Sequence, residues 1–174
     1  EQWDAVHGKA HDMARRQAEL YHDEVHGVLA DIGVSIVDRD DLTAEERSDL
    51  RDHFENSILP TLTPLTFDPA HPFPFISNLS LSLAVVTRAD PDEDAKFSRV
   101  KIPKNRPRLV RVDDGDDESA RFVRIEEVVE ANLDLLFPNV EVLETSTFRV
   151  TRNAEVRRNE EVAEGLIEMI ENVL

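Results

Sequence analysis

Hydrophobic residues recur at three- and four-residue steps through the first part of the chain. Residues 2–32 contain no proline, and their apolar side chains keep a helical spacing from Trp3 to Ile32. This spacing predicts one long amphipathic helix, which at about 1.5 Å per residue would be roughly 45 Å long. Gly33 then supplies a C-terminal stop, and residues 34–37 follow as a short strand.

A second helix is predicted from about residue 44 to residue 58. Thr43 and Glu46 have the spacing of a capping box, in which each side chain bonds the other residue's backbone N–H. Pro60 and Pro64 end this helix. Residues 59–78 contain five prolines, which argue against regular structure, and three phenylalanines, which argue against a flexible linker. We therefore expect an ordered, partly buried loop.

The pattern then changes to alternation. Leucine alternates with serine in residues 79–87, which predicts a strand with one buried face. The same reading gives further strands over 97–102, 108–112, 121–125 and 141–150, acidic turns over 89–95 and 113–118, and helices over 126–137 and 155–174. The predicted fold class is α+β, with a mostly antiparallel or mixed sheet of about five to six strands and no internal repeat.

These elements suggest one domain over residues 1–174. It would consist of a helical lead-in (1–58), the ordered Pro-rich loop (59–78) and a sheet with two helices (79–174). The chain begins almost inside a helix and ends on the apolar pair Val173-Leu174, whereas natural termini are usually polar. We expect a domain excised from a longer protein.

Composition excludes several classes of protein. The 174 residues are 40% hydrophobic, which suffices for a core, and 20 basic against 37 acidic residues give a net charge of −17. The absence of cysteine excludes disulfides, thiolate zinc sites and cysteine nucleophiles. No apolar run approaches the ~20 residues of a transmembrane segment, and the negative charge disfavours nucleic acid as a partner.

The basic residues are mostly arginine, since only 4 of the 20 are lysine. Many carboxylates with few lysines are typical of salt-adapted cytoplasmic proteins, whose surfaces stay solvated at high salt. An acidic protein from a GC-rich genome would have the same composition, and both interpretations stay open. We expect a cytoplasmic protein.

Histidines form two pairs at helical i,i+4 spacing, so each pair shares a helix face. The pairs are His7/His11 and His22/His26. A zinc protease would carry glutamate directly after the first histidine, where this chain has Asp23, and only His53 offers a third ligand. Solvated histidines are therefore favoured, and the alternative is a metal-dependent hydrolase that uses His22 and His26. His71, in the Pro-rich loop, is interpreted as a structural hydrogen-bonding residue.

The chain has neither a Gly-x-Ser-x-Gly elbow nor a Gly-rich phosphate loop. Basic residues nevertheless cluster twice, and guanidinium groups suit phosphate oxygens. The clusters are Arg99, Lys101, Lys104, Arg106, Arg108 and Arg111, and then Arg149, Arg152, Arg157 and Arg158. Alternation places Phe148, Val150 and Arg152 on one face of a strand and Arg149 on the other. For any single arginine, a surface ion pair is the favoured interpretation.

Four segments resemble the middle domain of the bacterial polyphosphate kinase family. They are ILPTLTPLTFDPAHPFPFISNLSLSLAVVTR, which begins at Ile58, FSRVKIPKNRPRLVRV (97–112), RFVRIEEVVEANLDLLFP (121–138) and FRVTRNAEV (148–156). The most specific string is the His-Pro-Phe-Pro stretch followed by Ser-Asn-Leu-Ser-Leu. The first 30 residues fit only as a helical lead-in.

The resemblance implies an enzyme that reversibly transfers the terminal phosphate of ATP to polyphosphate through a phosphohistidine, with Mg²⁺. It implies an N-terminal domain that helps to hold adenine and two C-terminal domains that carry the chemistry. This chain would then contain no catalytic residue, no metal ligand and no cofactor of its own. It would act as a scaffold and in homo-oligomer contacts, and as a wall of the polyphosphate path through Arg149 and Arg152. A pure interaction module without substrate contact is the remaining alternative.

Overall fold

The computed structural model describes residues 2–67, 76–112 and 119–151. The chain divides into two compact units, each made of two stretches of sequence. The first unit comprises Glu1–Leu50 and Arg108–Arg124, and the second comprises Arg51–Pro107 and Ile125–Leu174. We describe each unit by itself.

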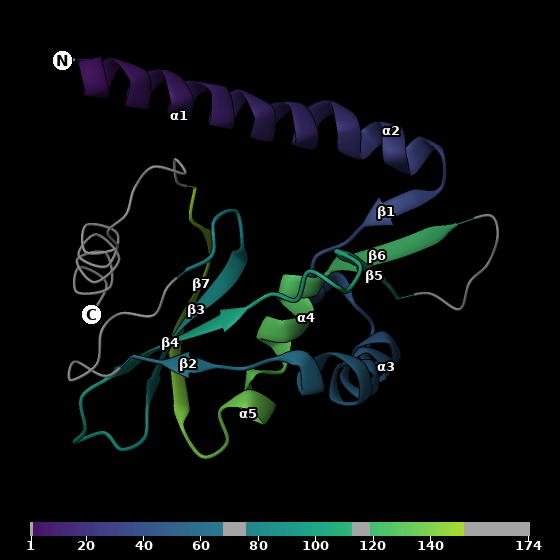
Figure 1. The fold of residues 1–174 in the computed structure, drawn as a ribbon. Helices are drawn as coiled ribbons and strands as arrows, with labels where there is room; N and C mark the ends of the chain where they lie inside the picture. The colour runs from purple at the N-terminus through teal and green to yellow at the C-terminus, as the bar shows by residue number, and fades with distance from the viewer. Residues whose placement is uncertain (1, 68–75, 113–118, 152–174) are drawn as a thin grey trace. The chain divides into compact units, whose positions relative to one another are not determined.

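A long helix opens the first unit, as the sequence predicts (Figure 1). It consists of α1 (Gln2–Leu20), a π-helical turn (Tyr21–Val25) and α2 (His26–Asp31). None of its residues is buried. Gly33 follows with φ = 77°, a left-handed conformation that glycine adopts without a steric cost and that stops the helix.

The sheet of the first unit has three strands in the order β1-β6-β5. These strands are β1 (Val34–Ile36), β5 (Leu109–Arg111) and β6 (Ala120–Arg124). β1 is parallel to β6, and β5 is antiparallel to β6. A backbone hydrogen bond of 2.8 Å from Val37 N to Phe122 O extends the parallel pairing beyond β1. Since parallel strands need a long crossover connection, the partner of β1 lies far along the chain.

The predicted capping box at the start of α3 (Ala44–His53) is confirmed. The Thr43 backbone N–H donates to Glu46 Oε2 at 2.7 Å, and the Glu46 backbone N–H donates to Thr43 Oγ1 at 3.2 Å. The helix continues as a π-helical turn (Phe54–Ile58) and a 3₁₀ turn (Leu59–Thr61), so it ends at the predicted prolines.

The second unit contains a four-stranded antiparallel sheet in the order β2-β4-β3-β7. Its strands are β2 (Leu65–Thr66), β3 (Leu81–Arg88), β4 (Lys96–Lys101) and β7 (Glu141–Arg149). The expectation that prolines exclude regular structure from 59–78 is wrong at β2. This two-residue strand fits between Pro64 and the later prolines because it lies at the sheet edge, where proline is tolerated.

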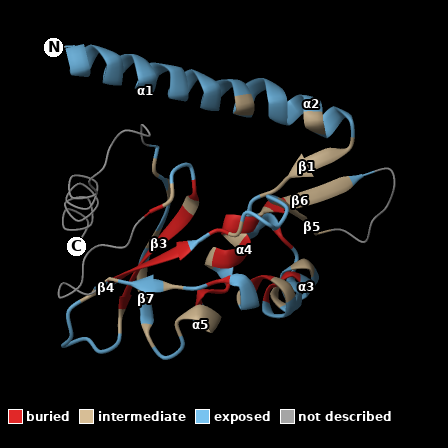
Figure 2. Cartoon of the chain, in the orientation of Figure 1, coloured by how far each residue is buried: buried red, intermediate tan, exposed pale blue. Residues whose placement is uncertain are grey.

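β3 is buried on both faces, so the prediction of a single buried face is wrong. Its six central residues are all buried, as the red strand in Figure 2 shows. The serines can be buried because their hydroxyls have partners: Ser82 Oγ accepts from Arg99 Nε at 3.1 Å, and Ser80 Oγ donates to Ser77 O at 2.7 Å. Leu79 precedes the strand with φ = 56° and is 56% exposed.

The helix predicted over 126–137 is interrupted at Asn132. The structure has α4 (Ile125–Ala131) and α5 (Leu133–Leu136) instead. The buried Asn132 side chain donates from Nδ2 to Val128 O at 2.8 Å and accepts from Arg51 Nη1 at 3.2 Å. Asparagine competes in this way with the backbone bonds of a helix interior, which explains the break.

The core of the second unit lies between its sheet and its helices. Its most buried apolar residues are Phe54, Ile58, Ile76, Leu83, Val85, Val100, Ile125, Val128 and Val129. The α+β class is confirmed, with strands in two sheets. The predicted loop 113–118, the C-terminal helix 155–174, and His71 lie outside the described residues. That residues 1–174 form one excised domain, divided as predicted, stays a prediction.

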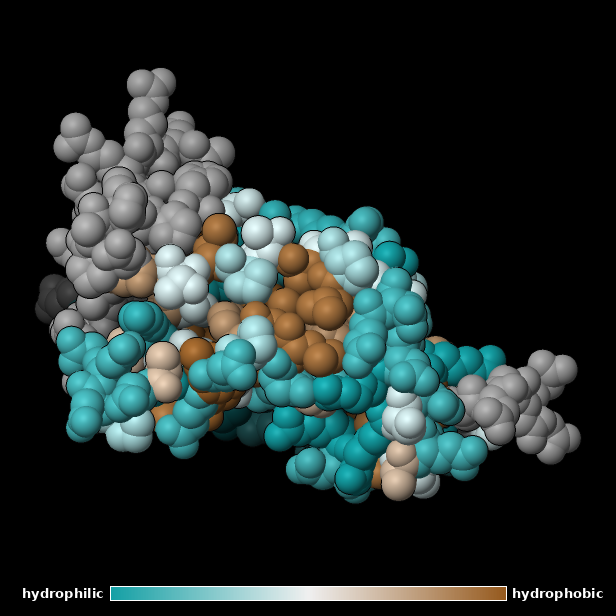
Figure 3. Space-filling model, turned by 90° about the horizontal axis from the view of Figure 1, so that it is seen from below, coloured by the Kyte–Doolittle hydropathy of each residue, from teal (hydrophilic) through white to brown (hydrophobic). Residues whose placement is uncertain are grey.

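On the face seen in Figure 3, hydrophilic residues surround a central patch of apolar residues. This agrees with the large excess of carboxylates. Within the described ranges, no helix has both the length and the apolar character that a membrane span requires.

Candidate functional site

Arg149, the first predicted phosphate contact, is the last residue of β7. It is exposed, whereas the preceding Phe148 is partly buried, as the alternation predicts for these two residues. Arg149 pairs with Leu81 across the β7–β3 ladder. Arg152, the second predicted contact, lies outside the described residues.

The basic cluster predicted over residues 99–111 is divided between the two units. Arg108 and Arg111 belong to the first unit, and the other four residues belong to the second. In the first unit, Arg111 Nη2 donates to Ser119 O at 3.2 Å.

Arg99 and Lys101 extend from one face of β4, because they are two residues apart on the strand. Arg99 is only 3% exposed, and its burial lowers the pKa of the guanidinium. Lys101 is exposed, and its Nζ lies 3.5 Å from Ser77 Oγ. The sequence showed the charges but not that one of them is buried.

Arg149 does not share this face of the sheet. Lys101 pairs with Ser82, and Ser82 pairs with Phe148, so these three side chains point to one side. Arg149 is the next residue along β7 and points to the other side, the one that Thr145 shares. Thr145 Oγ1 bonds Glu130 of α4, so Arg149 lies on the face of the sheet that α4 covers.

An open pocket of about 380 Å³ lies beside Arg99 and Lys101. The other residues that line it come from two segments: Thr61, Thr63 and Leu65 up to the start of β2, and Pro103, Lys104 and Asn105 after β4. Sequence reasoning missed Thr63 and Asn105, because the only local signal was the flanking prolines.

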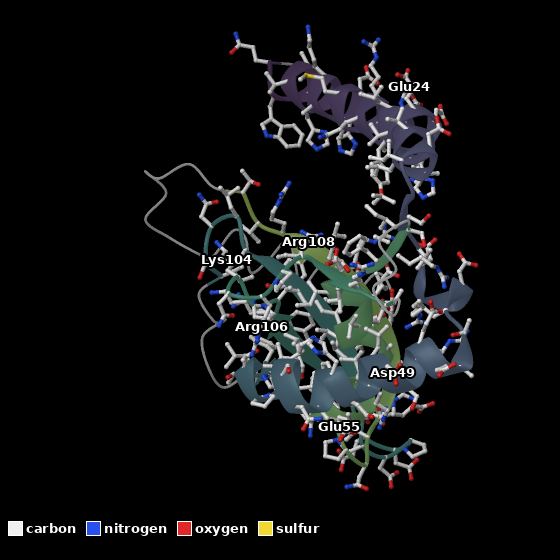
Figure 4. All side chains as sticks on the ribbon, turned by 90° about the vertical axis from the view of Figure 1, so that its right-hand side faces the viewer. Glu24, Asp49, Glu55, Lys104, Arg106 and Arg108 are labelled. Carbon is white, nitrogen blue, oxygen red and sulfur yellow. The ribbon has the colours of Figure 1, made fainter. Side chains whose placement is uncertain are left out.

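The segment after β4 is bonded to the π-helical turn that follows α3. Arg106 Nη2 donates to Ser57 O at 2.7 Å. Lys104 and Arg106 can both be followed on this segment in Figure 4. This contact limits the positions available to Lys104 and Asn105.

Several other arginines form ion pairs, as the sequence favoured. In the first unit, Arg121 pairs with Glu46 and Arg124 with Asp38. In the second unit, Arg51 Nη2 lies 2.7 Å from Asp134 Oδ2. The hydrogen bond from Arg51 lowers the pKa of the Asp134 carboxyl. These arginines stabilise the fold and are not candidates for ligand binding.

The histidine pairs make aromatic and backbone contacts. The His7 ring stacks on Trp3 at 4.7 Å, and the Tyr21 ring contacts both His22 and His26 edge-on. His26 Nε2 lies 3.2 Å from Ile36 O. No group of three or more histidine or carboxylate side chains in the described part of the chain is arranged to hold a metal ion.

Comparison with known proteins gives concordant matches. The chain is 41% identical over 169 residues to a polyphosphate kinase of Mycobacterium avium (strain 104), covering 93% of this chain and 23% of that protein. It is 40% identical over 169 residues to a polyphosphate kinase of Streptomyces coelicolor, covering 97% and 22%. The chain thus spans about a quarter of the length of these curated relatives.

The fold also has a counterpart among solved structures. The crystal structure of polyphosphate kinase from Porphyromonas gingivalis matches with a TM-score of 0.70 and 23% identity, covering 87% of this chain and 27% of that one. At the level of sequence families, residues 45–174 match the family described as "Polyphosphate kinase middle domain". This chain therefore belongs to the polyphosphate kinase middle-domain family.

Proposed function

We propose that this chain is the middle domain of a cytoplasmic polyphosphate kinase, which reversibly transfers the terminal phosphate of ATP to polyphosphate through a phosphohistidine. The observation that carries this proposal is the match of residues 45–174 to the middle-domain family, in a chain that spans a quarter of its relatives. ATP and Mg²⁺ would then bind to other domains of the full-length enzyme.

Within that enzyme, the chain would act as a scaffold. Phosphoryl transfer depends mainly on positioning and charge neutralisation, so a domain that aligns the catalytic parts contributes to the rate without reacting itself. Its partners would be the enzyme's own N- and C-terminal domains and a second copy of the enzyme. The four-stranded sheet, with β3 buried on both faces, supports such a positioning role.

Arg149 and Arg152 are the proposed polyphosphate contacts, with Arg149 on the α4 side of the sheet. The exposure of Arg149 at the end of β7 supports this assignment. β7 is also the outermost described strand of its sheet, so a ligand approaching from this side meets no further described strand.

The proposal is tested with γ-³²P-labelled ATP. We expect the full-length native chain to incorporate label and to make polyphosphate, and residues 1–174 alone to do neither. Label on the 174-residue chain would contradict the scaffold role, and a full-length chain that makes no polyphosphate would contradict the kinase assignment.

The same full-length assay tests the arginines. Reversing both charges (Arg149→Glu with Arg152→Glu) should weaken polyphosphate binding, because two phosphate contacts become repulsive. The matched control is Arg15→Glu, since Arg15 is an exposed arginine on α1 that pairs with Asp12 and Glu19 of the same helix. Unchanged polyphosphate affinity in the double variant would contradict the two arginine contacts, and the scaffold role would remain.

A further inference from the structure

We propose that the pocket beside Arg99 and Lys101 is a second contact for an inorganic phosphate chain, separate from Arg149. The pocket belongs entirely to the second unit and is about 380 Å³ in volume, within the range of about 300–1,000 Å³ usual for small-ligand sites. The identification of polyphosphate as the ligand rests on the proposed function. The preference of the pocket for phosphate groups follows from the residues that line it.

The residues that line the pocket match the chemistry of phosphate oxygens. Arg99, Lys101 and Lys104 supply three cationic groups, and Thr63 and Asn105 add neutral hydrogen-bond donors. Among the described lining residues, none is acidic and none is aromatic. An aromatic ring would be expected for stacking on a nucleobase, so the pocket favours a chain of phosphates over a nucleotide or single-stranded nucleic acid.

Arg99 differs from a surface arginine in its environment. It is 3% exposed, and its Nε donates to the buried Ser82 Oγ at 3.1 Å. A charge removed from water interacts more strongly with a counter-ion than an exposed charge does. The hydrogen bond to Ser82 also fixes the guanidinium plane, so less side-chain entropy is lost when an anion binds.

The two lysines lie nearer to solvent. Lys101 is exposed at the end of β4, and Lys104 is exposed on the segment that follows. The hydrogen bond from Arg106 to Ser57 O at 2.7 Å positions that segment before any ligand arrives. The pocket therefore combines one buried cation with two exposed cations, an arrangement suited to a ligand that carries several phosphate groups.

The net charge of −17 does not oppose this assignment. At physiological salt the Debye length is about 8 Å, so carboxylates beyond that distance are largely screened from a ligand in the pocket. Among the described residues that line the pocket, all the charged ones are cations.

Titration calorimetry of the 174-residue chain with tripolyphosphate tests the inference. We expect binding at about 50 mM salt that weakens as salt is raised. Replacing both lysines (Lys101→Gln with Lys104→Gln) should weaken binding by about tenfold or more, since charge-assisted contacts are lost. Thr63→Val should weaken binding several-fold without any change in charge.

The matched control is Lys96→Gln. Lys96 lies at the opposite end of β4, is exposed and pairs with Glu93 at 3.7 Å, so its replacement should leave the affinity unchanged. No binding by the unmodified chain, or an equal loss for Lys96→Gln and the double variant, would overturn the inference. Because the titration needs no turnover, these outcomes differ from a failure of the proposed function, in which the full-length chain makes no polyphosphate.

Discussion

At the scale of single residues, Asp134 links solution pH to the stability of the second unit. Arg51 donates to both of its carboxylate oxygens, at 3.1 and 2.7 Å. These bonds lower the pKa of Asp134, and the Arg51 pKa is raised by the same contact. A carboxyl whose pKa is lower in the folded state stabilises that state at neutral pH, because the unfolded chain binds the proton more readily.

We expect Asp134→Asn to lower the urea midpoint slightly at pH 7, since the pair is largely exposed and water screens it. This difference in urea midpoint should persist as the pH is lowered to about 3.9, the pKa of aspartate in the unfolded chain. It should then disappear as the pH falls through the lower folded pKa. Urea titrations at several pH values measure this difference.

The matched variant is Glu55→Gln, which removes the weaker partner of Arg51 at 3.7 Å and should have a smaller effect. A difference in urea midpoint between Asp134→Asn and the unmodified chain that grows as the pH falls would contradict the lowered pKa of Asp134.

Residue-scale features were predictable when their cause was local in sequence. Thr43 and Glu46 are three residues apart, so their capping box could be predicted directly. The break at Asn132 could not, because one of its two side-chain partners is Arg51, far away in the chain. The pocket was missed for the same reason, since Thr63 and Asn105 are far apart in the chain and line one pocket beside the paired strands β2 and β4.

At the scale of elements, β3 determines the core of the second unit. It pairs with β4 on one side and β7 on the other, and both of its faces are buried. Leucine-serine alternation predicted the strand but treated the serines as solvent-facing. Alternation reports which side chains share a face, but whether a second layer covers the polar face depends on tertiary packing.

A pair of leucines on this segment tests the boundary of the core. Leu83 is 1% exposed within β3, whereas Leu79 is 56% exposed just before it. Leu83→Ala should destabilise the fold by about 2–5 kcal/mol through lost burial and a cavity. Leu79→Ala should change stability by no more than about 0.5 kcal/mol.

Denaturant unfolding of the two variants measures both values. Equal losses would mean that Leu79 is buried as the alternation predicted, and would contradict the structure of this segment.

At the scale of the whole molecule, the excess of carboxylates sets the response to salt. The chain has 37 acidic and 20 basic residues, so repulsion among the carboxylates outweighs their attraction to the basic groups. Added salt screens that net repulsion. The sequence could predict this property, because net charge does not depend on the fold. The division into two units was not predictable, since it depends on long-range pairings such as that of β1 with β6.

We expect the melting temperature to rise as sodium chloride is raised from about 10 mM to about 500 mM, a range over which the Debye length falls several-fold. Thermal melts followed by circular dichroism measure the effect. Potassium chloride should give the same curve, because screening depends on ionic strength. A melting temperature that falls with salt would mean that favourable ion pairs outweigh the net repulsion.

Because the first unit is made of two separate stretches of sequence, it also constrains the order in which the strands pair during synthesis on the ribosome. Its two stretches are separated by Arg51–Pro107, so β1 is synthesised long before β6, its partner. The two strands of the β3–β4 hairpin in the second unit are close in sequence, and both have been synthesised once Lys101 is added. We infer that the hairpin forms first during translation, and that the nascent chain carries an unpaired β1 until Arg124 has emerged.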